Sequence, residues 1–248
     1  MFHGVMKMSK VLLKSAFTVG LLIMLMAVPV YGASVNKSIK IDAGSESDGA
    51  TTVNGSISVG EGSVVTGTLQ TVNGKIRVDD NSTIEDASTV NGRLSISDDV
   101  KSHNLETVNG SVSVGENSTV AGDVEAVNGG IRLERGSEVA KGVGNVNGDI
   151  VLVASEVGGN VSTVNGDVDL SDGSIVKGDL IVEKPSKWSF DNSNNRMPEI
   201  VIGPGSEVRG TIRLEREVKL YISESAKVGG VEGEMSMSDA VRFSGQHP

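Results

Sequence analysis

Residues 53–71 read VNGSISVGEGSVVTGTLQT, and much of the chain repeats this unit with small changes. The tripeptide Val-Asn-Gly returns seven times, and successive copies begin 18 or 19 residues apart. A fixed period of this length is typical of a solenoid, in which each repeat forms one coil and stacks on its neighbours. The copies begin at Val53, Val72, Val90, Val108, Val127, Val146 and Val164.

Within the unit, short apolar pairs alternate with corner residues. Ile57 and Val59 would point to the same side of a strand, and glycine or asparagine at 54–55, 60–62 and 66–67 would form three corners. Three strands of about six residues account for the period. The pattern therefore predicts an all-β fold: a single-stranded β-solenoid, or triangular β-helix, of about ten turns and roughly 45–50 Å in length. It leaves the handedness open.

Each Val-Asn-Gly corner places a glycine and an asparagine at a fixed position. We expect the glycines to adopt positive φ, which this residue takes without steric cost. Because stacked coils lie about 4.8 Å apart, the asparagine amides are expected to form a hydrogen-bonded ladder. An exposed asparagine row would also suit contact with a ligand. The predicted ladder consists of Asn54, Asn73, Asn91, Asn109, Asn128, Asn147 and Asn165.

The first 32 residues have the composition of an export signal. Three lysines precede an apolar run at 16–30, and Val30-Tyr31-Gly32 fits a signal-peptidase site. The alternative is an uncleaved membrane anchor, but the run is shorter than the roughly 20 residues that span a bilayer. We therefore expect residues 1–32 to be a signal peptide and the protein to be exported to the periplasm or cell surface.

The remainder divides into a solenoid at 33–233, with an inserted loop at 183–199, and a polar C-terminal tail at 234–248. The insertion holds the only tryptophan, Trp188, with Phe190 two residues later. An aromatic pair in a polar loop is typical of a recognition site for a glycan or a protein. The alternative is that Trp188 covers the side of the rod.

Charge and cysteine content exclude several classes of function. The chain has 22 basic and 32 acidic side chains, a formal net charge of −10, and no cysteine. Loss of residues 1–32 would remove three lysines and leave a charge of −13. An acidic rod repels nucleic acid, and a chain without cysteine forms neither disulfides nor thiolate metal sites.

The sequence disfavours two classes of β-helical enzyme. Acyltransferases built from hexapeptide repeats use a histidine base, and His103 is the only histidine within the predicted coils. Polysaccharide lyases need clustered acids for calcium, whereas Asp79-Asp80, Asp98-Asp99 and Asp172 fall on separate corners. We expect solvated corners at these positions and no catalytic residue, cofactor or metal site.

Ice binding is a third alternative. Thr71, Thr89, Thr107 and Thr163 fall in one column before Val-Asn-Gly, and threonine columns on flat β-helical faces order water. Other residues interrupt the column, and the sequence has no paired Thr-x-Thr face.

A second rhythm, Val-x-Gly-x-aliphatic, occurs at 65–69, 120–124, 176–180 and 208–212. It resembles the bactofilins, bacterial β-helix proteins that form polymers. The Thr-Val-Asn-Gly-x-Ile rhythm is similar to exported bacterial β-strand-repeat proteins classed as adhesins. These resemblances cover nearly all of the chain after the signal. They imply a non-catalytic structural or adhesin-like role in the cell envelope, with self-association or another envelope component as the partner.

Overall fold

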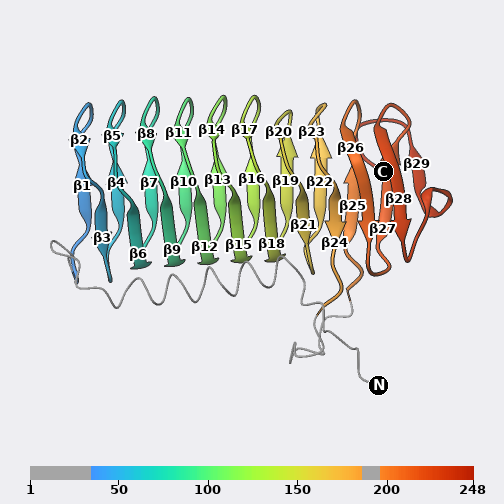
Figure 1. The fold of residues 1–248 in the computed structure, drawn as a ribbon, viewed down its shortest axis with the longest axis horizontal. Helices are drawn as coiled ribbons and strands as arrows, with labels where there is room; N and C mark the ends of the chain where they lie inside the picture. Colours follow the sequence, from blue (N-terminus) through green and yellow to red (C-terminus); the bar gives the residue numbers. More distant parts are fainter. Residues whose placement is uncertain (1–34, 186–195) are drawn as a thin grey trace, which may run out of the picture.

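The computed structural model describes residues 35–185 and 196–248 as a single row of stacked coils (Figure 1). Within these ranges every regular element is a β-strand, apart from the short 3-10 helix η1 (Met237–Asp239). Successive coils follow one another along the long axis, so that order in the sequence is order in space. The prediction of an all-β solenoid of about ten turns is confirmed.

One coil contributes three short strands, for example β4 (Ile57–Val59), β5 (Val64–Val65) and β6 (Leu69–Asn73). Each strand pairs in parallel with the strand at the same position in the next coil. The strands therefore form three long faces. The second and third faces join into one sheet because β26 (Glu207–Leu214) and β28 (Lys227–Gly233) extend across both.

The first face, called face A below, is an 11-stranded sheet of β1 (Ile39–Ile41), β4, β7 (Ile76–Val78), β10 (Leu94–Ile96), β13 (Val112–Val114), β16 (Ile131–Leu133), β19 (Ile150–Val153), β22 (Val168–Ser171), β25 (Glu199–Ile202), β27 (Lys219–Ser223) and β29 (Val241–Phe243). The second face contains β2 (Glu46–Ser47), β5, β8 (Thr83–Ile84), β11 (Lys101–Ser102), β14 (Thr119–Val120), β17 (Glu138–Val139), β20 (Glu156–Val157) and β23 (Ile175–Val176). The third contains β3 (Ala50–Thr52), β6, β9 (Ala87–Asn91), β12 (Leu105–Asn109), β15 (Val124–Asn128), β18 (Val143–Asn147), β21 (Val161–Thr163) and β24 (Leu180–Val182).

The core is a stack of thin aliphatic layers. Alternation along β4 buries Ile57 and Val59 completely and leaves Ser58 partly exposed. The register places Ile57 between Ile39 and Ile76, so that inward side chains form columns along the rod. Each buried aliphatic side chain contributes about 1.5–3 kcal/mol, and stability therefore accumulates coil by coil.

Much of the difference between 18 and 19 residues per coil is absorbed at the third corner. Three residues separate Val65 from Leu69, whereas two separate Ile84 from Ala87. Val65 still pairs with Ile84 and Leu69 with Ala87, and all four side chains are buried. The insertion lengthens the corner without reversing an inward side chain.

The reason predicted for the Val-Asn-Gly glycines is wrong. Among the seven, only Gly148 has a positive φ, of 123°. Adjacent coils instead approach so closely here that a Cβ on Gly110 would collide with the carbonyl oxygen of Gly92. At all seven positions an added Cβ would lie within 3.0 Å of backbone in the preceding coil. The glycines are therefore required by close contact between coils.

Left-handed backbone occurs at the second corner instead. Gly62 has φ of 68°, and Asn81 and Asp99 occupy the same corner of the next coils with φ of 58° and 56°. Asparagine and aspartate tolerate this region better than other residues with a Cβ. The left-handed backbone thus explains why an acidic residue, Asp99, lies at this corner.

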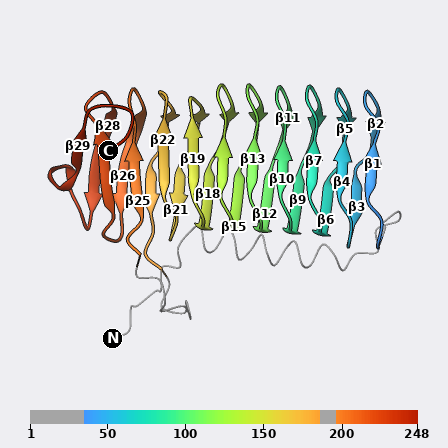
Figure 2. The same ribbon diagram turned by 180° about the vertical axis from the view of Figure 1, so that it is seen from behind.

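The expectation of a polar C-terminal tail is corrected. β29 pairs in parallel with β27, and Phe243 within it is only 8% exposed. Met235 and Ala240 pack against the core as well. Figure 2 shows β29 at the C-terminal end of the row of coils. The solenoid therefore continues to Phe243, because these three apolar side chains cover the layer beneath them.

Candidate functional site

The asparagines of the Val-Asn-Gly corners lie in one exposed column and are joined through their side chains. The Nδ2 group of Asn109 donates to Oδ1 of Asn91, and its own Oδ1 accepts from Asn128, each at 2.9 Å. The column begins one coil earlier than predicted, because Asn36 accepts from Asn54. Seven bonds of 2.8–2.9 Å connect Asn36, Asn54, Asn73, Asn91, Asn109, Asn128, Asn147 and Asn165.

The last asparagine of the ladder is held by a residue that the repeat pattern does not mark. The Nη1 atom of Arg216 donates to Oδ1 of Asn165 at 3.0 Å and to the carbonyl of Val164 at 3.2 Å. Its Nη2 donates to the carbonyl of Arg196 at 3.4 Å. Arg216 is 51 residues from Asn165 in sequence, and no local signal points to this contact.

The threonines before Val-Asn-Gly lie on the inside of the rod. Oγ1 of Thr89 donates to the carbonyl of Gly74 at 3.0 Å, and Oγ1 of Thr107 donates to that of Gly92 at 3.1 Å. This column therefore supports the close glycine corners and presents no flat surface to water. The ice-binding alternative depended on Thr71, Thr89, Thr107 and Thr163, which are at most 3% exposed.

Carboxylates and amides at the other corners also connect one coil to the next. Oδ1 of Asp80 accepts from the backbone N–H of Asp98 at 3.1 Å, and Oδ1 of Asp98 accepts from that of Glu116 at 2.8 Å. Each of these two carboxylates therefore uses one oxygen to join its coil to the next. Within residues 35–185 and 196–248, no three or more His, Cys, Asp or Glu side chains are grouped to hold a metal ion.

His103 contacts an aspartate of the preceding coil. Its Nδ1 lies 3.0 Å from Oδ1 of Asp86, and both side chains are nearly half exposed. The same oxygen also accepts from the backbone N–H and the side-chain amide of Asn104, at 3.0 and 2.9 Å. Asp86 is thus part of a corner hydrogen-bond network. Acyl-transfer chemistry would require a nucleophile and oxyanion donors beside the histidine.

An acidic stripe crosses the third face. Glu106 in β12 is paired in register with Glu125 in β15, so that two carboxylates lie on adjacent strands. Burial and, to a lesser extent, the negative charges of Glu125, Asp86 and Asp123 together raise the pKa of Glu106 to about 7. The stripe therefore holds a carboxyl group that titrates near neutral pH.

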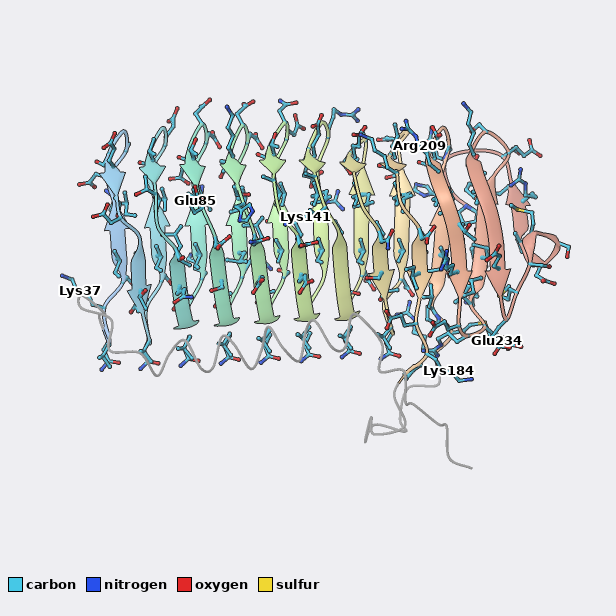
Figure 3. The ribbon with its side chains drawn as sticks, viewed as in Figure 1. Lys37, Glu85, Lys141, Lys184, Arg209 and Glu234 are labelled. Carbon is cyan, nitrogen blue, oxygen red and sulfur yellow. The ribbon has the colours of Figure 1, made fainter. Side chains whose placement is uncertain are left out.

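The two aromatic residues predicted as a recognition site, Trp188 and Phe190, lie outside the described residues. The flanks of the insertion are described and are fixed to the rod. Arg196 forms an ion pair with Asp167, and the backbone N–H of Lys184 donates to Glu215 at 3.3 Å. The labelled Lys184 marks the point where the chain leaves the coils (Figure 3).

A shallow pocket of about 220 Å³ lies on face A beside the returning end of the insertion. Three strands of the sheet, β19, β22 and β25, contribute its walls. Its lining combines carboxylates with aliphatic side chains: Asp149, Ile150, Val151, Asp167, Val168, Asp169, Glu199 and Val201.

Comparisons with protein-family models, with curated proteins and with solved structures found no match for this chain. In the described part of the chain, no helix has the length and apolar character needed to cross a membrane. The predicted signal peptide at 1–32 lies outside that part.

Proposed function

We propose that this chain is a non-catalytic, exported structural rod of the bacterial cell envelope, adhesin-like in character, which assembles end to end. The observation that carries the proposal is the asparagine ladder, with seven side-chain hydrogen bonds from Asn36 to Asn165. These asparagines are regular enough to form a repeated binding site, but their side chains bond to one another and join the coils. A rod of this kind acts through its ends and faces.

The two ends support association between rods. In the first coil Ile41 and Ala50 are each 8% exposed, whereas Ile57 in the second coil is fully buried. Among the described residues, the strands of this coil pair on one side only. At the other end Val241 is 54% exposed and Met237 is 41% exposed. Open strand edges and exposed apolar side chains favour stacking of one rod on another.

Negative-stain microscopy of protein recovered from the producing cell's envelope tests this function. We expect rods joined end to end, and more of them as ionic strength rises, because salt screens the repulsion between acidic chains. Isolated short rods at every salt concentration would contradict end-to-end assembly.

Export is tested separately by mass spectrometry of the same material. Cleavage after Gly32 predicts a mature chain that begins at Ala33. Detection of intact Met1 or Met8 in the envelope fraction would contradict the cleaved signal.

A glycan- or protein-binding module that uses the Trp188 loop is the second candidate. Its support is the anchoring of both flanks of the insertion, by Arg196 to Asp167 and by Lys184 to Glu215. Such anchoring presents a loop at a fixed place on the rod. The Trp188→Ala variant should then lose binding to a cell-wall glycan that the unchanged protein retains, with its melting temperature unaltered.

A further inference from the structure

Face A can be described as a grid, because every strand in it is paired in register with its neighbours. We number its rows from 1 at β1 to 10 at β27. The terminal strand β29 is left out of the grid because it does not keep the alternation: the exposed Arg242 is paired with the inward Ile222. The centre column holds the outward residue between two inward ones, such as Arg77 in row 3 and Asp169 in row 8. The flank column holds the residue just before the first inward one, such as Lys75 in row 3 and Asp167 in row 8.

Basic side chains gather in the N-terminal half of this grid. Lys75 and Arg77 are in row 3, and Arg93 is in the flank column of row 4; all three are exposed. Arg77 also pairs with Asp79 of its own strand, with 2.6 Å between Nε and Oδ1. In the described part of the chain, neither Lys75 nor Arg93 forms an ion pair.

Acidic side chains gather in the C-terminal half. Asp149 is in the flank column of row 7, and Asp167 and Asp169 are in row 8. All three line the pocket, together with the aliphatic side chains of Val151 and Val201. Asp167 is paired with a cation within the chain. Burial raises the pKa of Asp169, and the nearby positive charges of His247 and Arg132 offset this rise only in part.

The two groups of charges are related by one symmetry operation. If two copies meet face A to face A in antiparallel orientation, about a twofold axis along the strands, then row n of one copy faces row 11 − n of the other and each column faces itself. Row 3 then faces row 8, and row 4 faces row 7. A single axis, midway between β13 and β16, sets Arg77 against Asp169, Lys75 against Asp167 and Arg93 against Asp149.

We propose that face A is a self-association surface that pairs two copies of this chain side by side in antiparallel orientation. The remaining positions are compatible with the same axis, because no like charges face each other in either column. In the centre column Lys40 faces Tyr221, Ser58 faces Val201, Ser95 faces Val151 and Ser113 faces Arg132. In the flank column Ser38 faces Lys219, Ser56 faces Glu199 and Ser111 faces Gly130.

The pocket gives the facing arginine a place to bind. The stem of Arg77 from the second copy packs against Val151 and Val201, and its guanidinium reaches the carboxylate of Asp169. The face is also large enough for a specific contact. Ten strand spacings by about five residues give roughly 700 Å² per copy, which is close to the size of a standard protein interface.

Side-by-side pairing is independent of the end-to-end assembly proposed above, and the two respond to salt in opposite directions. End-to-end stacking of acidic rods increases when their repulsion is screened, whereas attraction between facing opposite charges decreases. Dimers that dissociate at 1 M salt therefore indicate face A, and oligomers that grow with salt indicate the ends.

Charge reversal tests the pairing with two variants of the full chain. Arg77→Glu with Arg93→Glu sets carboxylates opposite Asp169 and Asp149, and Asp149→Lys with Asp169→Lys sets ammonium groups opposite Arg93 and Arg77. Each variant alone should dimerise about tenfold more weakly than the unchanged protein at low salt. An equimolar mixture should form a heterodimer, because all of the reversed positions again face opposite charges.

Sedimentation equilibrium measures these masses, and circular dichroism checks that each variant is folded. Heterodimer formation by two variants that are monomeric alone establishes the charge-directed contact. Equal association by the unchanged protein, each variant and the mixture would overturn the proposal. So would a monomeric unchanged protein at low salt and at tens of micromolar concentration.

The antiparallel orientation has its own test, which the absence of cysteine makes simple. Ser113→Cys in row 5 lies beside the axis, so a short bis-maleimide should crosslink two copies. Ser58→Cys in row 2 is the matched control, because its mate lies about seven strand spacings away, roughly 34 Å. Crosslinking of Ser58→Cys but not of Ser113→Cys would contradict the antiparallel axis.

Discussion

The coils between residues 35 and 166 and the coils after residue 196 form the same three faces by different means. The first region has short strands and a side-chain hydrogen bond at each Val-Asn-Gly corner, as between Asn109 and Asn91. The second has neither the tripeptide nor the ladder, and its strands are longer, with 8 residues in β26 and 7 in β28. Backbone pairing can therefore replace the ladder, while the stacked aliphatic core is common to both regions.

The largest effect should come from the shared core. Ile131 is 1% exposed, and Ile131→Asp places a carboxylate inside a thin aliphatic layer, at a cost of about 4 kcal/mol or more. Ser113→Asp changes an outward position on the neighbouring strand, with an effect within about 0.5 kcal/mol. Thermal unfolding of both variants checks this, and equal shifts would show that the strand register is wrong.

A smaller effect should separate the two regions. Gly110→Ala places a Cβ against the carbonyl oxygen of Gly92, and the displaced coils should cost about 2–3 kcal/mol. Gly230→Ala in the C-terminal region meets only a Thr211 methyl group at 3.9 Å and should change stability by less than about 0.5 kcal/mol. Urea unfolding measures both variants. A comparable loss of stability for Gly230→Ala would contradict the claim that close contact between coils requires the glycines of the Val-Asn-Gly corners.

The acidic stripe should make stability depend on pH. The folded pKa of Glu106 is about 7, above the ordinary glutamate pKa of 4.5, so the folded chain binds this proton more tightly. Its contribution to stability is therefore present below pH 4.5 and is lost as pH rises toward 7. Glu106→Gln should flatten this part of the profile and stabilise the protein at pH 8 by about 1–2 kcal/mol, since the site is partly solvated.

The charge of the side chains on the third face differs between the two regions. On this face the C-terminal coils have Arg213, which pairs with Asp179 at 3.2 Å. Arg213→Gln should leave the slope between pH 4.5 and 7 unchanged. Unfolding curves recorded at pH 5 and pH 8 compare the two variants, and a Glu106→Gln profile as steep as that of the unchanged protein would contradict the assignment.

The smallest effect should come from the ladder. Asn109→Ala removes two exposed side-chain hydrogen bonds and should cost about 1 kcal/mol. Arg216→Ala releases the last rung and should cost no more, because Asn165 still donates to Asn147. Thermal unfolding resolves differences of this size. A loss above about 3 kcal/mol for Asn109→Ala would mean that the ladder, rather than the core, holds the coils together.

Much of the fold could be predicted from the sequence because stacking repeats one local pattern at each coil. The alternation at Ile57 and Val59 identified the inward positions, and the recurring asparagine identified the ladder. The reason for the glycines could not be predicted, because it depends on how closely corners such as Gly110 and Gly92 approach. Sequence shows the period of that contact and not its distance.

Contacts that break the period could not be predicted. Arg216 reaches Asn165 across the insertion, and Phe243 closes the last layer from a segment with no repeat. The matching charges of face A could not be predicted either, because Arg77 and Asp169 become related only once the register assigns them to rows. Such relations require the three-dimensional arrangement.

Sedimentation velocity of the protein from the producing cell's envelope tests the account most directly, because a structural rod must associate. At tens of micromolar protein, the account predicts species heavier than one chain: side-by-side dimers at low salt and longer end-to-end species at high salt. A single sharp boundary with the mass of one chain at every ionic strength would contradict it.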